Sequence, residues 1–255
     1  MWTQVRAKLG HMLPRSVRHL WRRREIEALR DRNRGRSVAE IFSEIYRGNR
    51  WGGERGSFHS GSGSTSGHAE EYARVLSAFI RERRVQHIVD LGCGDFRVGA
   101  RLIDDRCTYT GIDVVEALVD SNRRLYANER VRFECLNIID DELPAGDLCL
   151  IRQVLQHLSN DQILSVLERT RKYPCVVVTE HYPAPGALRR KNMDKPCGED
   201  VRIYDGSAVF LDAPPFDRRL AGLLLDVDAG HYLVQPGERI RTYLIENPQL
   251  QAAAS

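Results

Sequence analysis

The sequence has no apolar run long enough to cross a membrane, and its first residues lack the apolar core of a secretory signal. Its six cysteines are scattered without a C-x-x-C pair, and most lie in or beside expected strands, where cysteine behaves as a small buried hydrophobe. This spacing argues against a zinc site and suits a reducing compartment. We therefore expect a cytoplasmic protein.

A strong charge of either sign is also missing. With 38 Lys and Arg against 35 Asp and Glu, the formal net charge is +3, which gives no strong nucleic-acid signal for the body of the protein. The 255 residues, 42% of them hydrophobic, suffice for one sizeable α/β domain with additional elements.

Positive charge is concentrated in residues 1–36, where we expect a basic N-terminal helical extension. Its arginines include Arg22-Arg23-Arg24, Arg30, Arg32, Arg34 and Arg36, and its apolar residues at helical spacing are Val5, Leu9, Met12, Leu13, Val17, Leu20 and Trp21. Two roles fit this pattern. The helix either packs on the domain or on a second subunit of a homo-oligomer, or contacts an anionic membrane surface or a phosphate-rich partner.

Residues 37–68 combine an expected helix with a loop rich in glycine and serine. The loop composition is that of a flexible linker, but Trp51 and Phe58 are costly to leave in water, and a linker needs neither. We therefore expect this segment to close over a cofactor, with Trp51, Ser60 and Ser64 facing it.

From residue 69 to residue 255, strands and helices alternate. The expected strands are His87–Leu91, Tyr109–Asp113, Arg132–Leu136, Asp147–Ile151, Cys175–Glu180, Leu223–Val227 and Arg239–Glu246. The expected helices are Ser37–Tyr46, which starts with a Ser37–Glu40 capping box, then Ala69–Arg83, Val98–Ile103, Glu116–Ala127 and Asp161–Lys172. This order predicts a doubly wound, mostly parallel sheet that binds ligands at the carboxyl ends of its strands.

A glycine-rich turn, Gly92-Cys93-Gly94, follows the first of these strands. The next strand ends in Asp113, a carboxylate placed to bind ribose hydroxyls. A dinucleotide fingerprint would have a third glycine where Arg97 stands, and the acid before the turn, Asp90, suits an ammonium group better than phosphates. Both observations favour S-adenosylmethionine over NAD.

These motifs resemble those of the class I S-adenosylmethionine-dependent methyltransferases over about residues 70–180. The resemblance is carried by Val89–Asp95, by Gly111-Ile112-Asp113, and by Asp147–Ile151 with Val154–Leu158. In addition, Ile45-Tyr46, Trp51-Gly52-Gly53, Ser60–Ser64 and Leu211–Phe216 resemble bacterial small-molecule and sugar O-methyltransferases of polysaccharide and secondary-metabolite pathways. The resemblance implies a Rossmann-like sheet of seven strands.

The resemblance also implies which residues bind the methionine and ribose parts of the cofactor. Asp90 would approach the ammonium group, and the backbones of Gly92 and Gly94 would border the ligand. Asp113 would take the ribose hydroxyls, and Arg152 would bind the carboxylate, unless it is a surface arginine.

On the adenine side, Val114 would pack on the ring. Asn137, with Ile138 beside it, stands where the family usually has an acidic residue near the adenine amino group. An asparagine can still accept a hydrogen bond from that group, so the departure leaves the cofactor assignment unchanged.

Three residues are candidates for catalysis. Methyl transfer to oxygen needs an aligned donor and acceptor and a base for the hydroxyl proton, and a neutral histidine suits that role near pH 7. His157 follows the fourth strand, where some sugar O-methyltransferases of this fold have their base; otherwise it belongs to a structural turn. Glu180 would orient His157 or contact substrate hydroxyls, and His181 is the rival base, unless the two form a buried structural pair.

Residues 182–222 show no regular pattern, and connections of such length are usually functional or disordered. We expect a substrate lid, because its polar residues offer partners to hydroxyls: Asp194, Lys195, Glu199, Asp200, Arg202 and Asp205. A Mg²⁺ ion on Glu180, Asp194 or Asp205 would suit hard carboxylates, although no spacing specifies such a site.

The sequence thus predicts an S-adenosylmethionine-dependent O-methyltransferase that acts on a hydroxyl of a sugar, an oligosaccharide or a related small molecule. One alternative is methylation of RNA or protein, which the N-terminal arginines favour; the Asn-Pro-Pro-aromatic signature of amino-group methylases is absent at Ile151–Val154. Another is a non-catalytic, cofactor-binding partner subunit.

Overall fold

In the computed structural model, the described residues are 15–53, 57–61, 67–229, 236–247 and 250. They contain one sheet in the order β3-β2-β1-β4-β5-β7-β6. Its strands are β1 (His87–Leu91), β2 (Thr108–Asp113), β3 (Val131–Cys135), β4 (Leu148–Arg152), β5 (Cys175–Tyr182), β6 (Gly222–Asp228) and β7 (Arg239–Glu246). Strands β1 to β5 are parallel, and β7 runs antiparallel to its neighbours β5 and β6. The predicted doubly wound sheet is confirmed.

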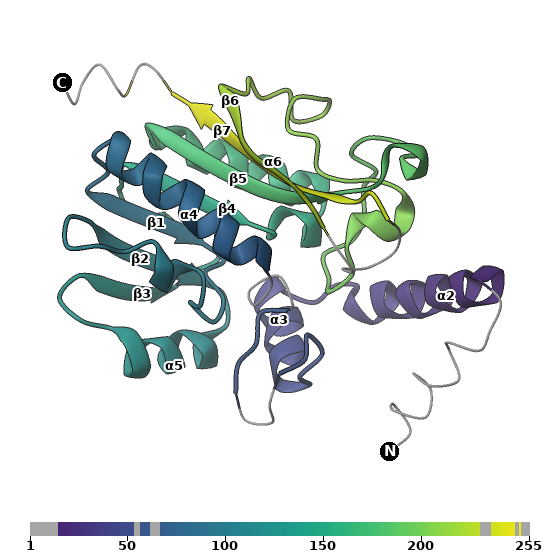
Figure 1. The fold of residues 1–255 in the computed structure, drawn as a ribbon. Helices are drawn as coiled ribbons and strands as arrows, with labels where there is room; N and C mark the ends of the chain where they lie inside the picture. Colours follow the sequence, from purple (N-terminus) through teal and green to yellow (C-terminus); the bar gives the residue numbers. More distant parts are fainter. Residues whose placement is uncertain (1–14, 54–56, 62–66, 230–235, 248–249, 251–255) are drawn as a thin grey trace.

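Helices cover both faces of this sheet, with α4 across the front in Figure 1 and α6 behind. The helices are α2 (Arg15–Asn33), α3 (Val38–Arg47), α4 (Gly67–Glu82), α5 (Glu116–Tyr126) and α6 (Asn160–Arg169). Short 3-10 turns are η2 (Gly99–Arg101), η3 (Leu155–His157), η4 (Thr170–Lys172), η5 (Pro185–Ala187) and η6 (Arg202–Asp205).

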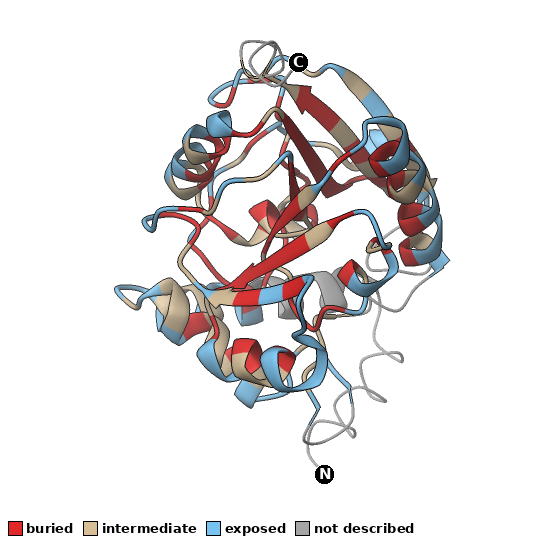
Figure 2. Ribbon diagram, turned by 90° about the vertical axis from the view of Figure 1, so that its left-hand side faces the viewer, coloured by how far each residue is buried: buried red, intermediate tan, exposed pale blue. Residues whose placement is uncertain are grey.

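Alternation along the strands divides the interior into two apolar cores. On β4, Leu148 and Leu150 pack in the core that includes α4, whereas Cys149 and Ile151 pack in the core that includes α3 and α6. The strands between these cores are largely buried (Figure 2). The continuous apolar character of β4 and β5 follows from burial on both faces.

Capping boxes start both helices that pack behind the sheet. The Ser37 hydroxyl accepts a hydrogen bond from the Glu40 amide at 3.2 Å, and the Glu40 carboxylate accepts one from the Ser37 amide at 2.8 Å. Ser159 and Gln162 repeat the arrangement at α6. The predicted start of α3 is confirmed, and each box satisfies amides that a helix leaves unpaired.

The helix expected at Val98–Ile103 is wrong, because only the turn η2 forms there. Phe96 adopts a φ of +62° and its ring packs on Tyr109 at 5.0 Å. A Cβ on Gly99 would lie 2.5 Å from the Tyr109 hydroxyl, so this segment is pressed against β2 and turns instead of extending as a helix.

Helix α2 supplies the N-terminal extension, and its last turns pack on the body of the protein, where Ile26 is buried. The expected apolar residues Val5, Leu9, Met12 and Leu13 lie outside the described residues. Among the residues that the structure describes, no helix has the length and hydropathy needed to cross a membrane.

Replacing Ile151 by Ala should lower the free energy of unfolding by about 2–5 kcal/mol, because this side chain is fully buried between β1 and β5. The control is Leu223→Ala on the edge strand β6, where the side chain is 51% exposed and a change within about 0.5 kcal/mol is expected. Denaturant titration measures both. Equal losses in the two variants would contradict the assignment of Ile151 to the core.

Candidate active site

A cavity of about 710 Å³ lies where β1, β2 and β4 end. Adjacent parallel strands place their carboxyl ends at one edge of a sheet, which is where doubly wound folds bind ligands. Further walls come from α2, α3, the loop after α3, and residues 199–204 of the segment between β5 and β6. The cavity therefore joins parts of the chain that are far apart in sequence.

The glycine turn after β1 lets the backbone come close to this cavity. Gly92 and Gly94 have φ values of +78° and +56°, which side-chain-bearing residues rarely adopt. A Cβ on Gly92 would lie 2.5 Å from Val154 Cγ2, and one on Gly94 would lie 2.3 Å from Ser60 Oγ. Both positions therefore require glycine for two reasons, conformation and space.

Asp90 and Arg152 form a pair of opposite charges in the cavity wall. The Tyr109 hydroxyl donates to Asp90 Oδ2 at 2.6 Å. Burial raises the pKa of Asp90 to about 6, although Tyr109 and Arg152 both favour its charged form. The Arg152 guanidinium lies 5.2 Å from the centre of the Tyr72 ring. A carboxylate beside a guanidinium offers one partner to the ammonium and one to the carboxylate of an amino-acid group.

Asp113 also lines the cavity, and backbone amides hold its carboxylate in place. The amides of Gly94 and Val115 donate to its two oxygens at 3.2 and 3.1 Å. Burial nevertheless raises its pKa to about 6. Val114, Asn137 and Ile138 line the cavity as well. The Asn137 side chain is engaged in its own turn, since its oxygen accepts from the Ile139 amide at 3.2 Å and its amide group donates to Asp140 at 2.7 Å.

Ser60, in the loop after α3, connects this loop to the glycine turn through hydrogen bonds with Asp95. Ser60 Oγ accepts from the Asp95 amide at 2.7 Å, and the Ser60 amide donates to the Asp95 carboxylate at 3.1 Å. The Tyr46 hydroxyl lies 2.9 Å from the same Ser60 Oγ. Ser60 and Trp51 thus lie in the cavity wall, whereas Ser64 is outside the described residues.

An aromatic cluster lines the part of the cavity next to α3. The Trp51 ring lies 5.9 Å from Phe42, 5.0 Å from Tyr46 and 5.6 Å from His157. Trp51 and His157 are predicted site residues, whereas Tyr46 carries part of the resemblance without being a predicted site residue, and Phe42 is not a predicted site residue. The spacing of four residues between Phe42 and Tyr46 on one helix was the signal that placed them on one face.

His157 is on the η3 turn after β4, and its ring is partly exposed inside the cavity. Its Nδ1 lies 3.1 Å from the Gly198 carbonyl oxygen, so Nδ1 carries the hydrogen and donates it. The surrounding protein atoms and the nearby Lys195 ammonium lower the pKa of His157 to about 4. The imidazole is therefore neutral at pH 7.

Glu180 and His181 differ in how they relate to the cavity. Glu180 is buried below the η3 turn and is outside the lining; its carboxyl group accepts from the Leu155 amide at 2.9 Å. Burial raises the pKa of Glu180 to about 8, so it is mostly protonated at pH 7. His181 does line the cavity, and its Nε2 lies 3.0 Å from Glu238 Oε2, with both side chains buried.

Most polar residues of the expected lid bind the protein itself instead of facing the cavity. Asp194 accepts from the Asn160 amide at 2.7 Å, Lys195 pairs with Asp200 at 3.5 Å, and Arg202 donates to the Leu158 carbonyl at 2.7 Å. From the six named residues, only Glu199 and Asp200 line the cavity. The expectation that many of these residues offer hydrogen bonds to substrate hydroxyls is thereby corrected, because their side chains bind other groups of the folded segment and of the protein body.

The same contacts account for the carboxylates considered as metal ligands. Glu180 binds the η3 turn, Asp194 binds the start of α6, and Asp205 pairs with Arg30 at 2.5 Å. Within the part of the chain that the structure describes, no group of three or more His, Cys, Asp or Glu side chains is arranged to hold a metal ion.

Replacing Gly94 by Ala should weaken binding of S-adenosylhomocysteine on the order of tenfold or more, because the new methyl group displaces Ser60 from the glycine turn. The matched control is Gly35→Ala, which has a similar φ of +75° but no atom within 4 Å of the new Cβ. Calorimetric titration measures both affinities. Equal affinity in the Gly94→Ala variant and the wild type would contradict the close approach described here.

Comparisons with known proteins agree with this geometry. Residues 89–173 match the family model described as a methyltransferase domain. The human N-acetylserotonin methyltransferase in complex with SAM is similar at a TM-score of 0.50 and 16% identity, over 83% of this chain and 60% of that chain. The magnesium protoporphyrin IX methyltransferase of Synechocystis PCC 6803, with bound SAH, is similar at a TM-score of 0.51 and 13% identity, over 82% of this chain and 100% of that chain. No curated protein matches the sequence.

At such identities the two solved structures establish the fold, and this chain spans 60% of the length of the human enzyme. The family model adds the domain type, and its matched residues contain the glycine turn, Asp113 and His157. Residues 89–173 thus match a methyltransferase domain, and they lie within a fold that these two solved methyltransferases share.

Proposed function

We propose that the protein transfers the methyl group of S-adenosylmethionine to a hydroxyl group of a sugar, an oligosaccharide or a related small molecule. The observation that carries the proposal is a single cavity whose wall includes both Asp113, suited to a ribose, and the aromatic cluster with His157. Its volume of about 710 Å³ is typical of sites for small molecules, which span roughly 300–1,000 Å³.

The cofactor would lie along the edge formed by β1, β2 and β4. Asp90 and Arg152 would bind the methionine ammonium and carboxylate, Asp113 the ribose hydroxyls, and Val114 the adenine face. The positively charged sulfonium would then be close to the Trp51 ring, whose negative face attracts a cation. The aromatic cluster therefore supports a methyl donor in this position.

Transfer to oxygen requires a new O–C bond to form as the C–S bond breaks, with the hydroxyl proton taken by a base. His157 is the base we propose, because it is neutral and lies in the cavity wall beside Trp51. Since Nδ1 donates to the Gly198 carbonyl, Nε2 is the ring nitrogen that would accept the proton. Glu180 would act from outside the cavity, by holding the turn that carries His157.

Two features support a small acceptor. The cavity is bounded by α2 and by residues 199–204 as well as by the sheet, which limits the size of what enters. Two arginines of the N-terminal region are paired with carboxylates: Arg30 with Asp200 and Asp205, and Arg36 with Glu44. These arginines are therefore less available for RNA than the sequence alone suggests.

Acceptor identity can be tested directly with the purified full-length chain. Release of S-adenosylhomocysteine would be followed with hydroxylated sugars, oligosaccharides and other small hydroxyl compounds, and separately with total RNA and with unfolded protein. We expect product, and a mass increase of one methyl group, only in the small-molecule arm. Product in the RNA or protein arm alone would refute the proposal.

Affinity for S-adenosylmethionine should fall as the pH drops through about 6. The raised pKa values mean that Asp90 and Asp113 both take up a proton near that pH, and a neutral Asp90 no longer attracts the ammonium group. In Asp90→Asn, the affinity at pH 8 should be lower and its pH dependence shallower, since only the Asp113 step remains. Calorimetry between pH 5 and pH 8 tests this. An unchanged pH dependence in the variant would contradict a role for Asp90 in binding the ammonium group.

Replacing His157 by Asn should lower kcat on the order of 10²–10⁴-fold, the usual contribution of a general base. Asparagine retains a donor for the Gly198 carbonyl but has no group in place of Nε2, so cofactor affinity should change little. His87→Ala, at the opposite end of β1, serves as a matched control with near-wild-type turnover. A kcat for His157→Asn close to that of the wild type would exclude His157 as the base.

A further inference from the structure

One arginine connects helix α2 to residues 195–205. This segment borders the part of the cavity that we assign to the acceptor, next to His157. Arg30 donates to Asp200 Oδ2 through Nε at 3.1 Å and through Nη2 at 2.8 Å, and it also reaches Asp205 Oδ2 at 2.5 Å. The Asp200 side chain is only 3% exposed, so this is a largely desolvated contact between residues 170 positions apart. One guanidinium thus bridges two carboxylates through charge-assisted hydrogen bonds, which are stronger than neutral ones.

Asp200 continues this contact inward. Its other oxygen, Oδ1, lies 3.5 Å from the fully buried Lys195 ammonium group, and Lys195 donates in turn to the His157 carbonyl oxygen at 3.3 Å. Gly198, which lies between Lys195 and Asp200 in the sequence, binds His157 twice. Its amide donates to the His157 carbonyl at 3.0 Å, and its carbonyl accepts from the imidazole Nδ1. Residues 195–200 therefore set both the backbone and the ring of His157.

Helix α2 also forms a wall of the cavity on the same side. Ile26 and Leu29 line it from one helix face, together with Val201 and Tyr204 from the segment that Arg30 holds. Asn33, in the last turn of α2, reaches the Cys197 carbonyl at 3.5 Å. The end of α2 thus touches residues 197–205 at several points.

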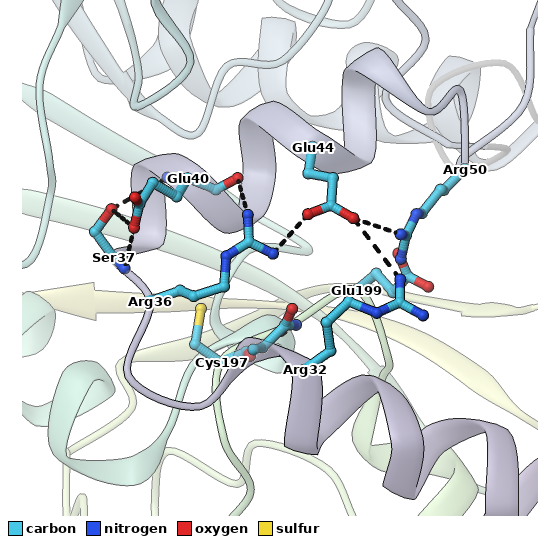
Figure 3. A network of polar contacts seen from close by, with 9 residues as sticks. Arg32, Arg36, Ser37, Glu40, Glu44, Arg50, Cys197 and Glu199 are labelled. Atoms are coloured by element: carbon cyan, nitrogen blue, oxygen red, sulfur yellow. Dashed lines mark hydrogen bonds and ion pairs between the residues drawn. The ribbon is translucent and has the colours of Figure 1, made fainter.

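A second set of ion pairs connects residues 195–205 to α3 and to the loop after it. Glu44 accepts from Arg36 at 2.6 Å and from Arg50 at 2.7 Å, and Arg50 also pairs with Glu199 at 3.0 Å (Figure 3). Arg32 of α2 lies 3.7 Å from the same Glu44. Residues 195–205 are therefore held between α2 and α3, and Arg30 is the contact that engages their buried carboxylate.

We propose that Arg30 is a positioning residue for methyl transfer: by holding Asp200 and Asp205, it keeps residues 195–205 where they orient His157 and close the acceptor part of the cavity. The N-terminal helix is then a component of the acceptor site. The effect on turnover rests on the proposed function, whereas the effect on the conformation of residues 195–205 does not.

The test compares Arg30→Ala and Arg30→Lys with the control Arg34→Ala, just after the end of α2, whose side chain is 82% exposed and pairs with Asp31, three residues before it. Hydrogen exchange followed by mass spectrometry reports on the Gly198 amide without any substrate. In Arg30→Ala, exchange over 195–205 should accelerate on the order of tenfold or more, since hydrogen bonds to charged groups are lost. Lysine keeps the charge but not the planar guanidinium, so the exchange rate in Arg30→Lys should lie between those of the wild type and Arg30→Ala.

Steady-state kinetics with an acceptor found in the screen give the second measurement. Arg30→Ala should raise the acceptor KM about tenfold and lower kcat, with an S-adenosylhomocysteine affinity within about threefold of the wild type; Arg30→Lys should recover part of both. A general loss of stability would instead weaken the cofactor and acceptor steps alike. Should Arg30→Ala not fold, Asp205→Asn removes one side of the contact and should shift exchange in the same direction.

Exchange in Arg30→Ala equal to that in Arg34→Ala would overturn the inference, whatever the kinetics show. Faster exchange with unchanged acceptor KM and kcat would also overturn it, since residues 195–205 would then not position the reaction. If the wild-type enzyme methylates no small molecule, the proposed function fails; in that case faster exchange still establishes that Arg30 holds residues 195–205.

Discussion

The close approach of the glycine turn to its surroundings is the constraint on which the rest of the site depends. Strands β1 and β4 are neighbours although η2, β2, α5 and β3 separate them in sequence, so the chain leaves the sheet in opposite directions on either side of β1. The cavity at this point can hold a ligand only if Gly92 and Gly94 carry no side chain, because a Cβ there would lie 2.5 Å from Val154 and 2.3 Å from Ser60. Ser60 lies where a Cβ on Gly94 would be, and its contact with the Tyr46 hydroxyl connects the aromatic cluster to the turn.

The site is assembled from groups that a folded interior disfavours. Burial raises the pKa of Asp90, Asp113 and Glu180 and lowers that of His157, so each ionic form is destabilised relative to water. A ligand with an ammonium group would recover part of the cost at Asp90. For His157 the same burial keeps the imidazole neutral. The electrostatics of the site thus favour a cationic donor and a neutral base.

The sheet was predictable because its information is local. Strand β1 and strand β7 begin and end where their apolar patterns predict, and the turn at Gly92–Gly94 follows from glycine spacing. The acceptor side was not predictable to the same degree. In the sequence, Asp200 and Asp205 look like free polar residues. Their partner Arg30 lies 170 and 175 positions away, in a helix that resembles a solvated one. Its cavity face carries Ile26 and Leu29, three residues apart, which the sequence analysis does not name.

The central claim is that one cavity binds the methyl donor along β1, β2 and β4 and directs its sulfur toward His157. A crystal structure with S-adenosylhomocysteine tests this most directly. The account predicts ribose hydroxyls at Asp113, the ammonium at Asp90, and the sulfur facing the space bounded by Trp51, His157 and α2. A ligand with its ribose away from Asp113, or with its sulfur turned away from His157, would contradict it.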